Sequence, residues 1–138
     1  MNPWLIALLA ALALAIILTI AYSIVRPAPI PLDIPAARAG LKSGQIQVAI
    51  DVRTPYEWST GHYAKALHIP AGQIFKQLPA AVPDRDTAIL FYCRTGSRAY
   101  AAAAAAQELG YTKLYYLSDS TSMDPAVDLE PQYNILNV

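Results

Sequence analysis

Apolar and polar positions follow three different patterns along the chain. Residues 4–25 are almost entirely apolar and carry no charge, which predicts one long helix. From residue 36 onward, short apolar runs alternate with segments of helical periodicity, a pattern typical of an α/β domain with a mostly parallel sheet. Residues 118–138 carry four acidic and no basic side chains, and they predict an irregular tail.

The first apolar segment is long enough to cross a membrane. Its 22 residues would span about 33 Å as a helix, against about 30 Å for a hydrocarbon core. A buried soluble helix would need apolar neighbours on every side, which the rest of a small chain cannot supply. A cleaved signal peptide is the other alternative, but residues 1–3 lack a basic side chain. We therefore expect a transmembrane anchor at 1–25 that contacts lipid through residues 4–25.

Basic residues and prolines after this segment predict how the domain is attached. Arg26, Arg38 and Lys42 follow the apolar run and no basic residue precedes it, which favours a cytoplasmic C-terminal domain on a single-pass anchor. Four prolines between residues 26 and 35 predict an extended spacer that holds the domain off the bilayer. The folded domain is then expected at 36–117.

Within 36–117 the alternation resolves into four helices and four strands. The helices are predicted at 35–42, 55–60, 72–78 and 97–109, and the strands at 46–50, 67–69, 88–92 and 113–117. The strand at 88–92 is apolar at every position, as in a central strand covered on both faces. Six consecutive alanines at 101–106 favour a helix that packs closely against the sheet.

The amino-acid composition excludes several kinds of site. Ten basic and ten acidic residues balance, so no nucleic-acid surface is indicated. A single cysteine excludes an intramolecular disulfide, and two histidines give no zinc-binding spacing, so we expect no metal. A lone thiol in the cytosol stays reduced, as a nucleophile requires.

The most informative segment lies between the apolar strand and the helix that follows it. It reads Cys93-Arg94-Thr95-Gly96-Ser97-Arg98. Such a turn can curl around the thiol so that backbone N–H groups and a helix N-terminus point at the sulfur and favour the thiolate. Gly96 supplies conformational freedom, and Ser97 is expected to cap the helix. Cys93 is thus a candidate nucleophile, although many lone cysteines are simply buried apolar residues.

This segment resembles the active-site loop of the rhodanese family. Residues 51–58, Asp-Val-Arg-Thr-Pro-Tyr-Glu-Trp, are similar to that family's Asp-Val-Arg signature, and residues 61–70 resemble its Gly-His-Ile-x-Gly-Ala-x-x-Ile-Pro element. In that element Lys65 replaces a glycine, which suggests backbone strain there. The resemblance implies a central five-stranded parallel sheet flanked by helices, preceded here by the transmembrane helix.

The resemblance also implies a sulfurtransferase. Cys93 would take sulfane sulfur from a small anionic donor such as thiosulfate, and then pass it to cyanide or a thiol, with no dissociable cofactor. Arg94 and Arg98 would attract the donor, and by resemblance Arg98 would also brace the loop by bonding its carbonyls, with Thr95 completing the loop. Asp51, Arg53 and Glu57 are expected to form one supporting ionic and capping network.

Three alternatives remain open. A cysteine phosphatase or arsenate reductase can share this fold, but phosphatase loops place five residues between cysteine and arginine, and Cys93 and Arg98 have four between them. A non-catalytic interaction module or structural membrane subunit would explain why residues 118–123 replace the family's Gly-Gly turn and tryptophan helix. Delivery of sulfur to a membrane-bound protein partner is the third.

Overall fold

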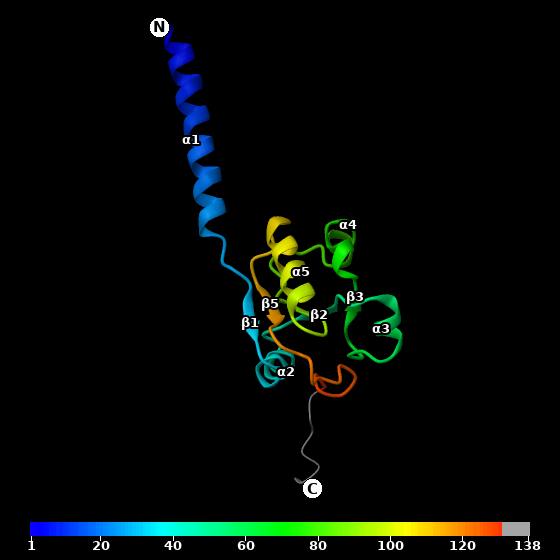
Figure 1. Ribbon diagram of the computed structural model, residues 1–138. Helices are drawn as coiled ribbons and strands as arrows, with labels where there is room; N and C mark the ends of the chain where they lie inside the picture. The colour runs from blue at the N-terminus through cyan, green and yellow to red at the C-terminus, as the bar shows by residue number, and fades with distance from the viewer. Residues whose placement is uncertain (131–138) are drawn as a thin grey trace.

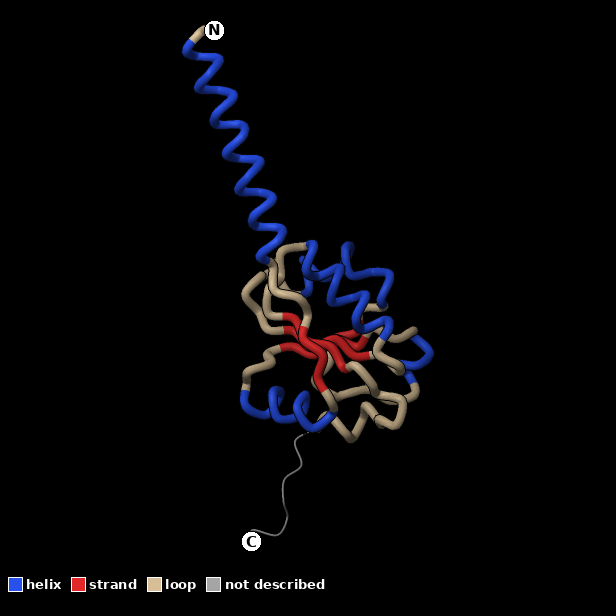
Figure 2. The backbone as a smooth tube through the Cα atoms, turned by 60° about the vertical axis from the view of Figure 1, so that its left-hand side comes forward, coloured by secondary structure: helices blue, strands red, loops and turns tan. Residues whose placement is uncertain are grey.

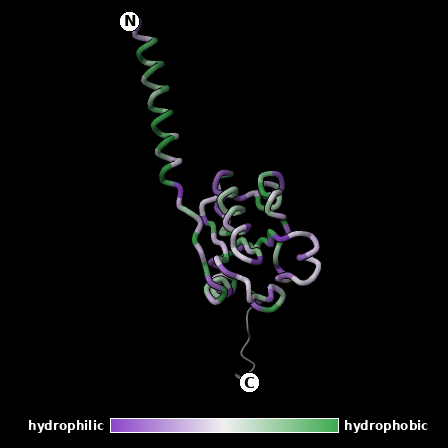
Figure 3. Tube along the Cα trace, in the orientation of Figure 1, coloured by the Kyte–Doolittle hydropathy of each residue, from purple (hydrophilic) through white to green (hydrophobic). Residues whose placement is uncertain are grey.

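An isolated N-terminal helix projects from one end of a small α/β domain (Figure 1). The computed structural model describes residues 1–130. Helix α1 (Pro3–Val25) begins at Asn2, whose side chain accepts a hydrogen bond from the Trp4 amide, and none of its residues is buried. It is the one helix in the described part of the chain that is long and apolar enough to cross a membrane, and it is apolar along its whole length (Figure 3).

The domain is built on one parallel sheet of five strands. In sheet order these are β1 (Ile30–Leu32), β5 (Leu114–Leu117), β4 (Ile89–Tyr92), β2 (Val48–Asp51) and β3 (Leu67–His68). All four strand pairs are parallel, which confirms the predicted fold class. Every residue of β4 is buried, as expected for an apolar strand with helices on both faces.

The edge strand β1 lies within the segment predicted to be a spacer. Ile30 is paired with Tyr115 and Leu32 with Leu117, so the folded domain begins before residue 36. The prolines obscured this strand, but an edge position tolerates Pro31 because one side of an edge strand needs no ladder partner. Only residues 26–29 remain to connect α1 to the sheet.

Helices cover both faces of the sheet (Figure 2). On one face lies α2 (Ile34–Ser43), which is capped by the Asp33 side chain and ends at Gly44 in a left-handed conformation. On the other face lie α4 (Ile74–Ala81) and α5 (Ser97–Glu108), and two short helices, α3 (Pro55–Ser59) and η1 (Ala71–Gln73), lie in connections. Each face has its own core of buried side chains.

The alanine-rich helix α5 lies directly against the sheet. Ala99, Ala102, Ala103 and Ala106 are each at most 1% exposed and belong to the core on the α4 side. Because an alanine side chain is a single methyl group, the helix backbone can approach the strands closely. This close approach determines where the N-terminus of α5 meets the end of β4.

The segment after β5 packs onto the domain although it contains no helix or strand up to residue 130. Leu129 is fully buried in the core on the α2 side, and the Arg38 guanidinium donates a hydrogen bond of 2.6 Å to the Asp128 carbonyl. Residues 118–130 are therefore an irregular but integral part of the domain. The remainder of the predicted tail, 131–138, lies outside the described residues.

Because this segment packs onto the domain, Leu129→Ala should strongly lower the stability of the fold. Removing a fully buried leucine side chain should lower the free energy of unfolding by about 2–5 kcal/mol. Val127→Ala is the matched control, because Val127 is 56% exposed and should change stability by less than about 0.5 kcal/mol. Urea unfolding of both variants measures the difference. Equal stabilities would show that the segment does not pack onto the core in solution.

Candidate active site

Cys93 directly follows β4, at the edge where the carboxyl ends of the parallel strands meet. Ligand sites of open α/β sheets lie at this edge. The thiol is nearly buried, with 1% of the residue exposed. Its Sγ atom accepts hydrogen bonds from the amides of Gly96 at 3.1 Å and Ala99 at 3.4 Å. Both donors belong to the first turn of α5, so negative charge on the sulfur is stabilised by backbone dipoles.

Gly96 makes this turn possible for two reasons. Its φ of +95° lies in the left-handed region, and a Cβ atom there would stand 2.3 Å from the Ser118 carbonyl oxygen. Gly96 is also the N-cap of α5 and has no side chain with which to cap it, so the first-turn amide of Ala99 bonds Cys93 Sγ instead. The predicted capping role of Ser97 is therefore wrong: Ser97 is the first helical residue, and its hydroxyl lies 3.2 Å from that of Thr95.

Ser120 holds the loop from outside and was missed by sequence reasoning. Its buried hydroxyl lies 2.5 Å from the Cys93 carbonyl oxygen and 3.0 Å from the Arg94 carbonyl oxygen, so its one proton is shared between them. The Ser120 hydroxyl therefore ties both loop carbonyls to the segment after β5. Nothing in the polar run after β5 singles out this serine, because the contact spans 26 residues or more along the chain.

Arg98 is engaged by Glu57 rather than by the loop. Its two terminal nitrogens donate to the two carboxylate oxygens at 2.8 and 3.0 Å. Glu57 also completes a capping box with Thr54 at the start of α3. The bond from Arg98, followed by those from Thr54, lowers the pKa of Glu57 to about 2, so this carboxylate stays charged at neutral pH. Among residues 1–130, Arg98 donates side-chain hydrogen bonds to Glu57 alone, so the expected bracing of loop carbonyls is absent there.

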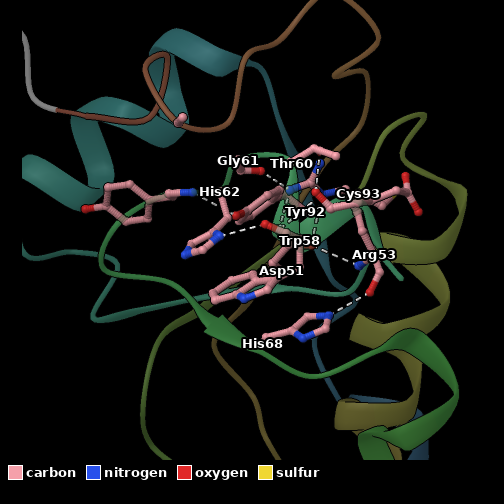
Figure 4. Close-up of polar contacts among 12 residues, drawn as sticks. Asp51, Arg53, Trp58, Thr60, Gly61, His62, His68, Tyr92 and Cys93 are labelled. Carbon is pink, nitrogen blue, oxygen red and sulfur yellow. Dashed lines mark hydrogen bonds and ion pairs between the residues drawn. The ribbon is translucent and has the colours of Figure 1, made fainter. Parts of the chain in front are cut away.

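Asp51 and Arg53 form a separate, buried pair. The Arg53 guanidinium donates to both Asp51 oxygens, with a shortest distance of 2.7 Å, and also to the Gly61 carbonyl at 2.7 Å (Figure 4). The three supporting residues predicted as one network are thus divided between two ion pairs, Asp51–Arg53 and Glu57–Arg98. The Glu57–Arg98 pair joins the segment after β2 to the start of α5, and the Asp51–Arg53 pair, with its bond to Gly61, braces that segment internally.

Two histidines hold the same segment through an aromatic stack. The Trp58 ring stacks on His62 and His68, with centroids 3.3 and 4.8 Å apart (Figure 4). His62 Nδ1 lies 2.8 Å from the Trp58 carbonyl oxygen, and His68 Nε2 lies 2.8 Å from that of Arg53. Because a carbonyl oxygen only accepts, these ring nitrogens carry the protons. Both histidines are therefore hydrogen-bonded parts of the scaffold.

A cleft of about 360 Å³ opens above Cys93. Its walls come from the segment after β2, the Cys93 loop (residues 93–98) and the segment after β5. They are formed by Arg53, Tyr56, Glu57, Thr60, Arg94, Ser120, Thr121, Met123 and Pro125. Arg94 is exposed at this cleft, and it is the one arginine of the wall that has no ion pair among the described residues.

Comparison with known proteins identifies the family. The profile of the rhodanese-like domain matches residues 34–122, which is more than half of the chain. The chain belongs to the rhodanese-like domain family. This match includes the strands β2 to β5, the Cys93 loop and the first residues of the segment after β5.

Individual relatives match different shares of the chain. A tRNA uridine(34) hydroxylase from Erwinia tasmaniensis is 39% identical over 74 residues, which are 51% of this chain and 21% of that protein. A human single-domain sulfurtransferase is 28% identical with a TM-score of 0.56, over 64% of this chain and 89% of that one. A thiosulfate sulfurtransferase from Pseudomonas aeruginosa is 26% identical with a TM-score of 0.57, over 67% and 18%. The chain thus spans about a fifth of the length of the curated relatives it matches.

The rhodanese-like domain accommodates Lys65 without backbone strain. Every residue with positive φ in the described part of the chain is a glycine: Gly44, Gly61, Gly96 and Gly110. Lys65 therefore has an ordinary backbone conformation, and the strain suggested by the glycine-to-lysine departure is not present.

The contacts of Ser120 predict a local loosening of the Cys93 loop in Ser120→Ala. Two loop carbonyls would lose their buried donor, so the free energy of unfolding should fall by about 1–3 kcal/mol. Amide hydrogen exchange at residues 94–99 should accelerate more than exchange in β4. Ser122→Ala, which removes an exposed hydroxyl from the same segment, should change neither quantity, and Ser120→Thr should restore much of the protection. Equal exchange in Ser120→Ala and Ser122→Ala would contradict the assigned contact.

Proposed function

We propose that this rhodanese-like domain is a sulfurtransferase that carries sulfane sulfur on Cys93 as a persulfide. One observation supports this most strongly: Sγ lies at the base of a cleft and accepts two backbone N–H bonds from the start of a helix. Such an arrangement stabilises a thiolate before reaction and a negatively charged persulfide after it. The relatives named sulfurtransferases share the fold that creates it.

The reaction divides into two transfers. In the first, the Cys93 thiolate attacks the outer sulfur of thiosulfate. An Sγ–S bond forms, the S–S bond of thiosulfate breaks with its electron pair, and sulfite leaves. In the second, cyanide or a thiolate attacks the outer sulfur of the persulfide, and Cys93 leaves as a thiolate while thiocyanate or a new persulfide forms. Donor and acceptor supply all atoms and electrons, so these steps call for no dissociable cofactor.

Arg94 is the group best suited to attract an anionic donor. The guanidinium groups of Arg53 and Arg98 are neutralised by Asp51 and Glu57, whereas Arg94 has no such partner among the described residues. An unpaired cation beside a cleft raises the local concentration of small anions. The name of the Pseudomonas aeruginosa relative favours thiosulfate as the donor.

Two other functions are less well supported. A phosphatase would need a longer loop to surround a tetrahedral phosphate, and only four residues separate Cys93 from Arg98. A non-catalytic interaction module is favoured by the low exposure of Cys93, at 1%, and by the unusual segment after β5 that forms part of the cleft wall. The inward-pointing amides argue for a reactive sulfur, since an inert cysteine has no need of them. We do not extend the tRNA activity named for the hydroxylase to this chain, because its charge balance indicates no nucleic-acid surface.

We further propose that α1 anchors the enzyme in a membrane. The helix has 23 residues and none of them packs against the domain core. Arg26 at its C-terminal end favours placement of the domain on the cytoplasmic side. There the sole cysteine would remain reduced between catalytic cycles.

Persulfide formation is the central prediction. The full chain in detergent, incubated with thiosulfate without reductant, should gain one sulfur, about 32 Da by intact mass, and cyanide should remove it. Cys93→Ser should gain nothing. If the folded wild-type protein gains no sulfur although Cys93 reacts with a thiol reagent, the sulfurtransferase proposal is wrong and the interaction module becomes the better one.

Arg94→Ala should weaken the use of thiosulfate. The loss of the unpaired cation should raise KM for thiosulfate about tenfold, equivalent to about 1.4 kcal/mol, with a smaller effect on the cyanide step. Arg94→Lys should recover part of the loss because it retains the charge. Lys113→Ala, which removes a positive charge outside the cleft wall, is the control for bulk electrostatics and should leave KM unchanged. A similar KM in Arg94→Ala and wild type would exclude Arg94 from donor binding.

A further inference from the structure

Helix α1 is fastened to the domain at the C-terminal end of α5. Arg26 Nη1 donates a hydrogen bond of 2.9 Å to the Gln107 carbonyl, and Gln107 Nε2 donates one of 3.0 Å to the Pro27 carbonyl. The Arg26 guanidinium also lies over the Tyr22 ring, 4.9 Å from its centroid, on the last turn of α1. Three residues after Pro27 the chain enters β1, which is paired with β5. The connection is therefore attached on both sides and does not resemble a loose tether.

The candidate active site lies at the opposite end of the same helix. The amides of Gly96 and Ala99 that hold Cys93 Sγ belong to the first turn of α5, and Gln107 belongs to its last. Gly96 and Ala99 precede Gln107 by eleven and eight residues, which at a rise of about 1.5 Å per residue separates these contacts by about 12–17 Å. Helix α5 thus holds the end of α1 and the Cys93 sulfur apart.

The direction of the strands independently places Cys93 and the connection to α1 at opposite ends of the domain. All five strands are parallel, and β1 starts just after the connection to α1, so the carboxyl ends of all strands point away from that connection. Cys93 lies at the carboxyl end of β4. Figures 1 and 2 show α1 leaving one end of the domain, while the segment after β5, drawn orange to red in Figure 1, lies at the other. Residues 120–125 of that segment include four that line the cleft.

We propose that this clamp of Arg26, Pro27 and Gln107 fixes the domain with its Cys93 cleft facing away from the bilayer, so that the acceptor is a water-soluble thiol that arrives from the aqueous side. A thiol at the membrane surface would have to extend about 12–17 Å to reach the sulfur. The inference rests on the proposed sulfurtransferase function and on the membrane anchor. It argues against delivery of sulfur to a partner thiol buried at the bilayer.

The transfer itself is a simple exchange. The acceptor thiol gives its proton to the outer sulfur of the Cys93 persulfide anion, and the resulting thiolate attacks that sulfur and forms a new S–S bond. The bond between Sγ and the outer sulfur breaks, and its electron pair stays on Cys93 as a thiolate. The proton remains on the transferred sulfur, so the acceptor leaves as a persulfide.

The test compares two acceptor thiols that differ in location. The full chain is reconstituted in vesicles with the domain outside and loaded with thiosulfate. Unreacted thiosulfate is then removed. Glutathione is added in one arm, and in the other the vesicles contain a lipid whose headgroup carries a thiol. Glutathione should remove the sulfur from Cys93, and the lipid thiol should do so at least tenfold more slowly at matched reactivity. Equal rates would overturn the proposed orientation.

A double variant tests the clamp itself. Arg26→Ala with Gln107→Ala removes both side-chain hydrogen bonds, so the domain should reorient and the lipid thiol should react several-fold faster than with wild type. Glu108→Ala changes an exposed neighbour on the same helix and should leave the lipid rate unchanged. If the double variant reacts with the lipid thiol no faster than wild type, the clamp does not set the orientation.

The outcomes separate this inference from the functions on which it rests. If the chain does not float with vesicles, the anchor and the orientation are both wrong. If it floats but never gains sulfur, the sulfurtransferase proposal fails, and the orientation is still measured through the sole cysteine. In that case a soluble maleimide should label Cys93 faster than a maleimide carried on a lipid headgroup, and equal labelling would overturn the orientation.

Discussion

Within a few residues, the chain must turn from a buried strand into a helix while its amides face inward toward a sulfur atom. This requirement at residues 93–96 shapes much of the domain. The N–H groups of Gly96 and Ala99 point at Sγ, and the carbonyls of Cys93 and Arg94 in the same turn need a donor from outside it. Ser120 supplies that donor from the segment after β5. The Cys93 loop and the segment after β5 therefore depend on each other, and the burial of Leu129 stabilises both.

The charges around the site show a similar division of roles. Asp51 neutralises Arg53 in the interior, and Glu57 neutralises Arg98 at the edge of the cleft. The Glu57–Arg98 pair joins the segment after β2 to the start of α5, the Asp51–Arg53 pair braces that segment internally, and neither pair leaves a net charge to attract an anion. Arg94 then provides positive charge where a donor would enter. This arrangement separates the arginines that position the loop from the arginine that would bind substrate, although all three lie close to Cys93 in the sequence or in space.

The sequence predicted features that depend on residues close together in the chain, and it missed contacts between residues far apart in the chain. The apolar run at 88–92, the helix at 97–109 and the curled loop between them follow from residues adjacent in the chain, and their positions agree with β4 and α5 within about one residue. Strand β1 was missed because it has three residues and contains Pro31, so its partner β5 defines it more than its own sequence does. The partner of Glu57 was misjudged for a related reason. Arg53 is near in sequence, but Arg98, 41 residues away, makes the bidentate contact.

Helix α5 links the candidate active site to the N-terminal helix, because each of its ends contacts one of them. Its first turn holds the sulfur, its last turn holds the end of α1, and the alanines between them let its backbone lie against the strands. Larger side chains at Ala99 or Ala103 would lift the helix off the sheet, since both residues are fully buried. Such a shift would withdraw the Gly96 and Ala99 amides from Sγ and would also move Gln107 away from Pro27. The alanine run therefore has a geometric role: it sets the distance between the sheet and the one helix that contacts both Cys93 Sγ and the end of α1.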